Sequence, residues 1–420
     1  MKLIIHRGSN QIGGNCVEVS TERTRLILDV GMPLTDLADR KQTRPKNLPV
    51  VPGLFDEGPR VDAVLISHAH GDHTGFLKWI RPEIPVYLSK GTSKMLMAGS
   101  IFAGQHNPPP SCQSNLEPNK PKRIGDITVT GFSVDHSAFD SLALLLEADG
   151  KRILYSGDLR LHGRKQGMAR QLIAHIQKNP VDVLVMEGTS LSRTHEPPQQ
   201  TEDELVETLT NEIRDCPGLV LASFSPQHID RFVSFYKATR KAGREFVADA
   251  YGAFVWHLAS GQIKIPKLSS KAGLHTYFNQ SFEWSWRSKK PQICRPIGKN
   301  RIELSAILEN PKRFVMLYRP SMTDLNFKNA VLRYATCIYS FWPGYLVQPE
   351  YRALKIKLAE AEGKFVQCHT SGHIFADDIV KFVNAINPRR VVPIHTEAPE
   401  RFQSFFKNTL LLKDGIPLII

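Results

Sequence analysis

Cysteine is scarce in this sequence, and no two cysteines are spaced as a pair. The six cysteines stand at positions 16, 112, 216, 294, 337 and 368, among 420 residues, and none forms a Cys-x-x-Cys motif. This pattern excludes a dense disulfide framework. In a chain of this length it is typical of reduced, buried thiols, so we expect a cytoplasmic protein.

Long apolar runs are missing as well. The N-terminal residues Met1–His6 lack the apolar stretch and the small-residue cleavage site of a signal peptide. No run of about eighteen apolar residues occurs anywhere, which excludes a membrane-spanning helix. The sequence also shows no internal repeat and no long low-complexity tract, so the chain is expected to fold as ordinary globular domains.

Acidic residues are few relative to basic ones. The chain has 54 Lys and Arg against 41 Asp and Glu, which gives a net charge of +13. Most of the excess lies in residues 237–313, where fifteen basic and five acidic residues give +10. Trp256, Tyr277, Phe278, Trp284 and Trp286 are interleaved with these charges. The stretch is either a surface for phosphates and unpaired bases or a solvated basic face over core tryptophans.

The length predicts two or three domains. Short β-rich runs alternate with turn signals over the first 190 residues, and several of them end in a polar residue followed by Gly or His. The runs expected as strands are 26–29, 62–67, 127–130, 152–155 and 181–186.

The pattern changes after about residue 195. A helix is expected from Thr201, as N-cap, to Cys216, followed by a strand at 220–223, a helix near 227–242 and a strand at 245–248. This succession predicts a parallel α/β unit. The strand texture of the first part returns at residues 364–368, and Asp414-Gly415 indicates a closing β-hairpin. We therefore expect one domain formed by residues 1–195 and 366–420, interrupted by a second domain at 196–365.

A run of metal-binding residue types follows one of the expected strands. His68-x-His70-x-Asp72-His73 places four potential ligands within six residues. The two histidines spaced by one residue can converge on one cation, while Asp72 and His73 face a neighbouring cation. Imidazole and carboxylate are ligands of Zn²⁺ and also suit Mn²⁺ and Fe. The run therefore predicts a site for two divalent metal ions, with Zn as the first choice and Mn as an alternative.

The His-x-His-x-Asp-His run resembles the signature of the metallo-β-lactamase superfamily. The second half of the chain narrows the resemblance to the β-CASP nucleases, and in particular to the bacterial ribonuclease J group. Glu187-Gly188-Thr189 is similar to their motif A, His369–His373 to motif B, and Pro393–Glu397 to motif C. The resemblance implies an αββα sandwich with an inserted α/β domain. We expect no counterpart of the C-terminal domain that ribonuclease J carries.

The resemblance also implies roles for individual residues. Asp72 would orient the attacking hydroxide, His373 would protonate the leaving oxygen, and Glu187 would hydrogen-bond His373 and keep it protonated. Asp29 would support the metal site, and Ser371 and the amide of Gly372 would cradle a phosphate. The implied metal ligands are His68, His70, Asp72, His73, His136, Asp158 and His395, with Asp158 bridging the two ions.

The expected activity is metal-dependent cleavage of single-stranded nucleic acid. Motif C carries a histidine, His395, which in the resembled family goes with RNA-processing members, so RNA is favoured over DNA. Endonuclease and 5′-exonuclease action both stay open, as does a homo-oligomer. Two alternatives remain: a small-molecule metallo-hydrolase of the same superfamily, and an inactive nucleic-acid-binding relative.

Overall fold

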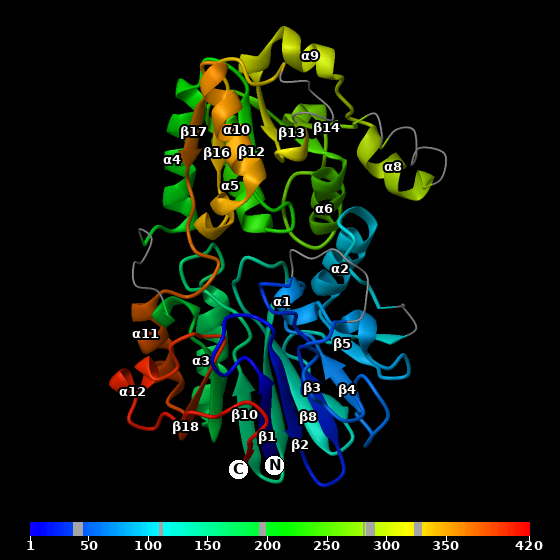
Figure 1. Cartoon of the computed structure of the whole chain (residues 1–420), viewed down its shortest axis with the longest axis vertical. Coiled ribbons are helices and arrows are strands. Elements are labelled where there is room, and N and C mark those ends of the chain that lie inside the picture. Colours follow the sequence, from blue (N-terminus) through cyan, green and yellow to red (C-terminus); the bar gives the residue numbers. More distant parts are fainter. Residues whose placement is uncertain (37–44, 109–111, 193–198, 280–281, 283–289, 323–329) are drawn as a thin grey trace. The chain divides into compact units, whose positions relative to one another are not determined.

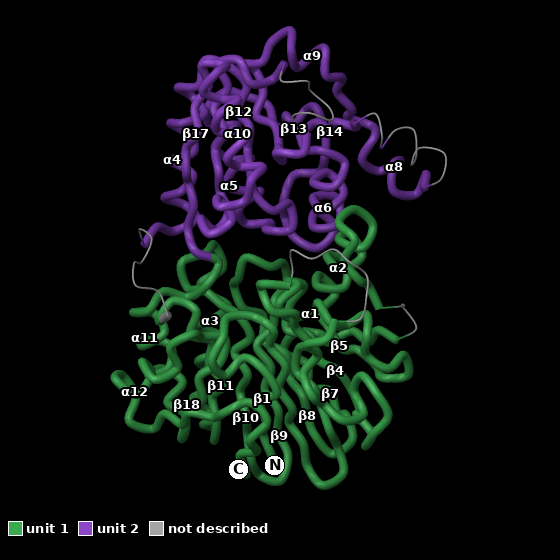
Figure 2. Tube along the Cα trace, viewed as in Figure 1, with its two compact units in different colours: residues 1–197, 372–420 green, residues 198–371 purple. Residues whose placement is uncertain are grey.

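The structure is a computed structural model of the 420-residue chain, and it describes residues 1–36, 45–108, 112–192, 199–279, 282, 290–322 and 330–420. The chain forms two compact units, one made of residues 1–197 and 372–420 and the other of residues 198–371 (Figure 2). Among the helices that the structure describes, none combines the length and the apolar character needed to span a bilayer.

The first unit contains two β-sheets (Figure 1). The strands of the first sheet are, in spatial order, β19 (Pro417–Ile419), β1 (Lys2–Arg7), β2 (Cys16–Ser20), β3 (Arg25–Leu28), β4 (Ala63–Leu65), β5 (Val86–Leu88) and β6 (Gln113–Asn115). Those of the second are β18 (Arg390–Ile394), β11 (Val183–Glu187), β10 (Lys151–Tyr155), β9 (Leu142–Ala148), β8 (Ile127–Ser133) and β7 (Lys122–Ile124).

Alternating side chains hold the first unit together as a layered sandwich. Leu144 and Leu146 of β9 point into a core shared with the first sheet, where they meet Leu3 and Val17. The intervening Leu145 points the other way, into a second core with helices. This period of two allows one strand to serve two cores. The helices of the unit are α1 (Gly71–Thr74), α2 (Lys90–Phe102), α3 (Gly167–Lys178), α11 (Ala376–Ile386) and α12 (Arg401–Phe405), with short 3₁₀ turns η1 (Leu77–Trp79) and η3 (Thr189–Ser192).

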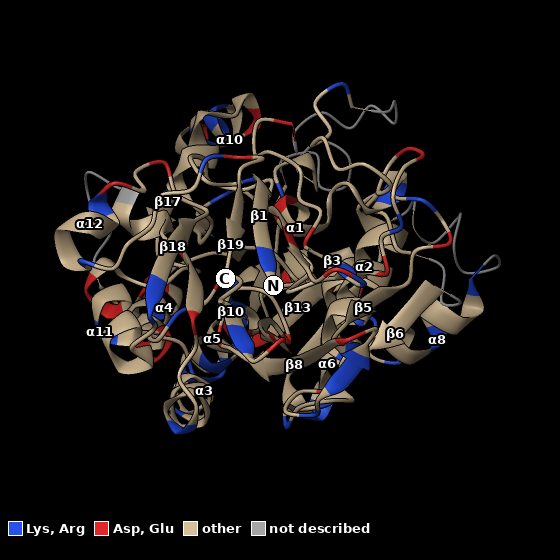
Figure 3. Ribbon diagram, turned by 90° about the horizontal axis from the view of Figure 1, so that it is seen from below, with Lys and Arg blue, Asp and Glu red and all other residues tan. Residues whose placement is uncertain are grey.

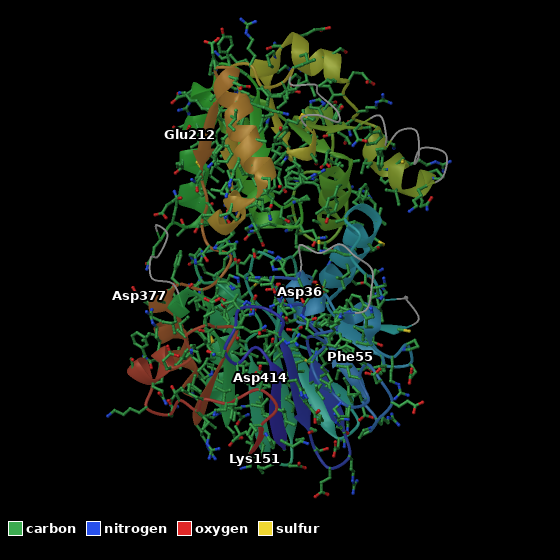
Figure 4. The ribbon with its side chains drawn as sticks, viewed as in Figure 1. Asp36, Phe55, Lys151, Glu212, Asp377 and Asp414 are labelled. Atoms are coloured by element: carbon green, nitrogen blue, oxygen red, sulfur yellow. The ribbon has the colours of Figure 1, made fainter. Side chains whose placement is uncertain are left out.

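The expected αββα sandwich is therefore confirmed, but the expected closing hairpin is wrong. Asp414-Gly415 does form a turn, and Asp414, labelled in Figure 4, accepts a hydrogen bond from the backbone N–H of Ser9 (3.1 Å). However, β19 pairs antiparallel with β1 rather than with the residues just before the turn. β1 supplies six residues of extended strand, whereas residues 410–413 just before the turn form no strand.

The second unit has one sheet in which every pairing is parallel. Its strands are, in spatial order, β14 (Leu274–Tyr277), β13 (Glu245–Asp249), β15 (Phe314–Leu317), β12 (Val220–Ser223), β16 (Thr336–Tyr339) and β17 (Lys364–Gln367). Its helices are α4 (Glu202–Asp215), α5 (Ile229–Lys241), α6 (Ala250–Ser260), α8 (Pro291–Gly298), α9 (Leu304–Glu309) and α10 (Pro349–Glu360), with short 3₁₀ turns η4 (Ser270–Ala272), η5 (Pro311–Arg313) and η7 (Pro343–Val347).

The structure places the return to the first unit later than the sequence indicated. We expected the return at residue 366, with residues 364–368 as the first strand of the returning segment. Instead this strand, β17, pairs with β16, and Phe365 packs against Tyr339 with ring centroids 5.8 Å apart. The second unit therefore extends to residue 371. The expected first crossing, at 195, falls within residues 193–198, which lie outside the described residues.

The described Lys and Arg side chains of the basic stretch are largely exposed, but Trp256 and Tyr277 are not. Figure 3 marks the Lys and Arg positions in blue. Arg295 of α8 is one of the exposed basic residues of the stretch. In contrast, Trp256 is fully buried and Tyr277 is 6% exposed. Trp284 and Trp286 lie outside the described residues. Trp256 and Tyr277 therefore agree with the second of the two possibilities that the sequence left open, in which aromatic side chains of this stretch belong to the core.

Candidate metal centre

The candidate ligands of the first unit lie at one edge of its sheets. Strands β8, β10, β11 and β18 run in the same direction, because β8 and β10 are both antiparallel to β9 and the other two are parallel to β10 or to each other. Their carboxyl ends therefore meet at a common edge. His136 lies after β8, Asp158 after β10 and His395 directly after β18, while Glu187 ends β11.

The structure brings the predicted ligands together in two groups. His68, His70 and His136 form the first, and the second contains four residues: Asp72, His73, Asp158 and His395. Within each group, one ligand atom from every residue lies within 4.8 Å of the others. Asp158 Oδ2 also lies 3.7 Å from both His68 Nε2 and His136 Nε2, so this carboxylate faces both groups. The arrangement has the donor set of a divalent-metal site.

Asp29 organises the histidines from behind. Its Oδ2 accepts hydrogen bonds from His73 Nδ1 (2.7 Å), Ser67 Oγ (2.8 Å) and Tyr155 Oη (2.8 Å), and its Oδ1 accepts one from the Ser67 N–H (2.8 Å). Asp29 has a positive φ of 57°, which turns its side chain beneath the site. Since Ser67 Oγ donates to Asp29, it accepts from His68 Nδ1 at 3.0 Å. The remaining nitrogen, Nε2, of His68 and of His73 is therefore directed at the ligand cluster.

A second chain of hydrogen bonds orients His395. Asn15 Nδ2 donates to Tyr155 Oη (3.2 Å), because the hydroxyl proton of Tyr155 is engaged with Asp29. Asn15 Oδ1 is then left to accept from His395 Nδ1 at 3.1 Å. Similarly, His136 Nδ1 donates to the carbonyl of Gly372 (2.6 Å). His395 thus keeps Nε2 free for a cation. His136 Nε2 lies 3.3 Å from both His70 Nδ1 and Ser137 Oγ.

Unpartnered buried atoms show that the residues present fit metal ions. Among the described residues, His68 Nε2, His395 Nε2 and Asp158 Oδ1 are buried without a hydrogen-bond partner. Buried polar atoms are normally satisfied, and leaving one unpaired costs about 1–3 kcal/mol. Three such atoms converging in one cluster are accounted for if each donates a lone pair to a cation.

The electrostatics of the cluster favour neutral imidazoles. Burial, reinforced by His73 and His136, lowers the pKa of His68 well below its ordinary value. Burial also lowers the pKa of His70, of His136 and of His395. Neutral imidazole is the form that binds metal.

His73 and Asp158 behave differently because they face each other, with His73 Nε2 3.1 Å from Asp158 Oδ2. Although burial opposes it, Asp158 and Asp29 raise the pKa of His73 well above its ordinary value. Burial raises the pKa of Asp158, but His395 and His73 outweigh it and hold that pKa well below the ordinary value. The proton between the two side chains therefore resides on His73, at the point where a cation held by both residues would replace it.

His373 lies beside this cluster with Glu187 behind it. His373 Nδ1 is 3.0 Å from Glu187 Oε2 and 3.3 Å from Thr189 Oγ1. Glu187 is fully buried, and its Oε1 accepts the Leu159 N–H at 2.9 Å, which fixes the carboxylate. His373 Nδ1 also lies 3.8 Å from Asp158 Oδ2, and the residue can be grouped with His136 and Asp158 as a ligand set. The geometry thus allows both the predicted acid role and metal ligation.

Ser371 and the amide of Gly372 were expected to contact a phosphate. The carbonyl of Gly372 is engaged by His136, while the phosphate contact predicted for its amide stays a prediction. Ser371 is the last residue of the second unit and is 2% exposed. Its predicted phosphate contact stays a prediction as well.

Sequence reasoning missed a buried ion pair that ties two ligand loops together. Asp135, next to His136, accepts a hydrogen bond from Arg160 Nε (2.8 Å), and Arg160 is 1% exposed. The backbone N–H of Arg160 donates to the Asp135 carbonyl (2.7 Å), and the N–H of Lys165 donates to Asp135 Oδ2 (2.8 Å). The loop after Asp158 is therefore wrapped around the residue preceding His136. The position of Asp135 directly before a predicted ligand was the only available signal.

Gly31 permits the closest backbone approach in the site. A Cβ at this position would lie 1.7 Å from the carbonyl oxygen of Asp72. The same oxygen accepts the N–H groups of Gly14 and Asn15 at 3.1 and 3.2 Å. The turn that carries Asp72 and His73 is thus held against two neighbouring loops, and this packing leaves room only for glycine.

Comparisons with known proteins agree with this geometry. Residues 26–211 match a family described as "Beta-lactamase superfamily domain", and residues 360–407 match one described as "Zn-dependent metallo-hydrolase RNA specificity domain". The chain is 28% identical over 236 residues to an RNase J-like protein of Methanocaldococcus jannaschii. The aligned region covers 53% of this chain and 51% of that protein. It is 23% identical over 430 residues to ribonuclease J of Mycolicibacterium smegmatis, covering 92% of this chain and 67% of that protein.

The chain spans about half the length of the first curated relatives that it matches. A crystal structure of a protein of unknown function from Enterococcus faecalis has the same fold, with a TM-score of 0.78 and 22% identity. That similarity covers 100% of this chain and 99% of the other.

Proposed function

We propose that this chain is a ribonuclease J-like, β-CASP member of the metallo-β-lactamase superfamily and that it is a metal-dependent ribonuclease acting on single-stranded RNA. The observation that carries the proposal is the convergence of seven metal-binding side chains beside the His373–Glu187 pair. The match of residues 360–407 to an RNA specificity domain supports RNA over DNA. We propose two divalent ions, with Zn as the first choice and Mn as an alternative.

The two groups of ligands divide the work of holding the ions. His68, His70 and His136 would hold one ion and Asp72, His73 and His395 the other, with Asp158 bridging both. When bound, such a pair of cations lowers the pKa of a water molecule and stabilises negative charge on a phosphate. Asp72 lies at the edge of the cluster, with Oδ2 3.7 Å from His395 Nε2, where it would orient the attacking water.

His373 would supply the proton for the leaving oxygen. Glu187 is held in place by the Leu159 N–H and faces His373 Nδ1, so it keeps that nitrogen protonated and directs Nε2 outward. The side chain of His373 is 20% exposed, whereas four histidines of the two ligand groups are fully buried and His70 is partly buried: the four are His68, His73, His136 and His395. An acid of this kind contributes about 10²–10⁴-fold to a rate. The exposure of His373 supports the acid role over metal ligation.

The test is cleavage of matched 5′-labelled RNA and DNA oligomers, with and without Mn²⁺ or Zn²⁺. We expect RNA cleavage that requires metal, and about two equivalents of bound metal by elemental analysis. His373→Ala should keep the metal and lose about 10²-fold or more in cleavage rate. His175→Ala, which removes an exposed histidine of α3, is the matched control and should change neither.

Two results would contradict the proposal. Loss of metal from His373→Ala would make His373 a ligand, and unchanged RNA cleavage by that variant would remove it from catalysis. A substrate with a leaving group that needs no proton sharpens the test, since His373→Ala should then lose much less. The cytoplasmic location and a homo-oligomeric state stay predictions, to be checked by cell fractionation and sedimentation.

A further inference from the structure

One loop of the second unit exposes two aromatic rings close together. Trp342 and Tyr345 are 49% and 40% exposed, and Val347 beside them is 67% exposed. In the same unit Trp256 is fully buried. Large aromatic side chains normally gain free energy from burial, so two that remain exposed within four residues mark a contact surface.

The rings are held in a fixed arrangement. The hydroxyl of Tyr339 donates a hydrogen bond to the backbone carbonyl of Trp342 at 2.8 Å. The rings of Trp342 and Tyr345 meet edge to face, with centroids 5.4 Å apart. A Cβ on Gly344 would lie 2.2 Å from the Trp342 ring, so this ring rests directly on the Gly344 backbone. A face that is ordered before binding loses little conformational entropy when a ligand stacks on it.

The position of the loop in the sheet favours ligand binding. Strands β12 and β16 are adjacent and parallel, and the helices that follow them, α5 and α10, cover opposite faces of the sheet. The faces can be assigned from β13, where Phe246 meets Phe232 of α5 while its neighbour Val247 shares a core with Leu354 of α10. Ligands of open parallel sheets bind where the connections diverge in this way. Trp342 and Tyr345 lie in the loop that leaves β16 at this point.

The charge of the unit selects the ligand. The surrounding unit carries the stretch with net charge +10, and Arg352 is exposed in the first turn of α10. An exposed ring on a unit that carries net positive charge fits an unpaired base attached to a phosphate backbone, because every base offers a flat π face. We propose that Trp342, supported by Tyr345, is a stacking platform for a base of single-stranded RNA. The choice of RNA rests on the proposed function, while the platform itself is built only from residues of the second unit.

The experiment measures binding to a fluorescently labelled single-stranded RNA in the presence of a chelator, so that no cleavage occurs. Trp342→Ala in the full chain should weaken binding about tenfold or more, as expected for loss of one stacked base. Trp342→Phe should restore most of the affinity, because it keeps an aromatic face. Val347→Ala, which removes an exposed side chain that is not aromatic, should bind like the unmodified protein.

An oligomer without bases separates stacking from other effects. The unmodified protein and Trp342→Ala should bind an abasic strand of the same length equally. Equal weakening for both strands would overturn the platform, as would unchanged affinity of Trp342→Ala for the normal strand. A change in sedimentation without a change in RNA affinity would assign the surface to a second copy of the chain and would also overturn it.

Gly344→Ala is a second variant that keeps both rings but displaces Trp342, and it should also weaken binding to the normal strand only. If Trp342→Ala fails to fold, Trp342→Phe and Gly344→Ala together decide the outcome.

The proposed function fails separately: a protein that binds RNA through Trp342 but never cleaves it keeps the platform and loses the ribonuclease activity. If the protein cleaves RNA but Trp342→Ala binds RNA as tightly as the unmodified protein, the ribonuclease activity is kept and the platform is lost.

Discussion

At the scale of single residues, Glu18 is a buried carboxylate surrounded by basic groups. It is 1% exposed, and its side chain meets Arg25 Nη2 at 2.7 Å and His6 Nε2 at 3.2 Å. Burial opposes ionisation, but the hydrogen bonds from His6 and Arg25 outweigh it and hold the pKa of Glu18 well below 4.5. A carboxylate whose pKa is lower in the folded than in the unfolded state stabilises the fold above its unfolded pKa, and this contribution is lost as the pH falls.

Glu18→Gln should therefore reduce stability in a pH-dependent way. At pH 7 we expect a loss of about 2 kcal/mol in the free energy of unfolding, because Arg25 and His6 lose a buried partner. The difference between the two proteins should shrink as the pH is lowered from 5 toward 2, since Glu18 then takes up a proton in the unfolded state while it stays ionised in the folded state. Urea unfolding of the metal-free proteins at a series of pH values measures this difference in the free energy of unfolding. Glu22→Gln removes the same charge at an exposed position and serves as control. Parallel stability curves for Glu18→Gln and the unmodified protein would contradict this account.

Predictability from sequence differs from residue to residue for a physical reason. The cluster His68–His73 can be predicted from the sequence because metal-binding residues of two kinds lie at short spacing. The distant His136, Asp158 and His395 were identified through the resemblance to a known family. Asn15 and Tyr155, which set the tautomer of His395, carry no such signal. A buried amide and a tyrosine are common in any core, and only the fold brings them to Asp29.

At the scale of elements, α4 begins with a complete capping box. Thr201 Oγ1 accepts the Glu204 N–H (3.2 Å), and Glu204 Oε2 accepts the Thr201 N–H (2.8 Å). Thr201→Ala should lower the free energy of unfolding by about 1 kcal/mol, because one helix N–H loses its partner. Thr201→Ser keeps the hydroxyl and should cost little. Chemical denaturation compares the three proteins, and an equal loss in both variants would assign the effect to packing rather than capping.

The same helix shows which elements the sequence could predict. Its start at Thr201 was expected because the N-cap signal and the apolar spacing are both local. The pairing of β17 with β16 and of β19 with β1 was not expected, because the sequence of a strand does not determine which neighbouring strand it pairs with. Residues 364–368 were correctly predicted as a strand yet placed in the wrong sheet. Element type is thus a local property, and sheet membership depends on contacts far apart in the chain.

At the scale of the whole molecule, the concentration of positive charge predicts salt-dependent binding. If exposed side chains such as Lys264 and Lys267 contact phosphates, the logarithm of RNA affinity should fall linearly with the logarithm of salt concentration. The slope should be about 0.7 for each contact. Replacing both lysines with alanine should therefore lower the slope by about 1.4, whereas Lys178→Ala in α3 should not change it. Salt titrations of binding in chelator give the slopes, and an affinity independent of salt would return these charges to a solvated surface.

The order of the chain through the first unit has a consequence for protein synthesis. The ligands His68 to Asp158 precede the second unit, whereas His373, His395 and strands β18 and β19 follow it. A ribosome needs roughly 10–35 s to make the intervening 170 or so residues. Throughout this interval the edges of β11 and β1 stand unpaired, which leaves both sheets open to non-native association. The nascent chain also has no His395 during this interval, so the second group of ligands stays incomplete until β18 and His395 have been synthesised.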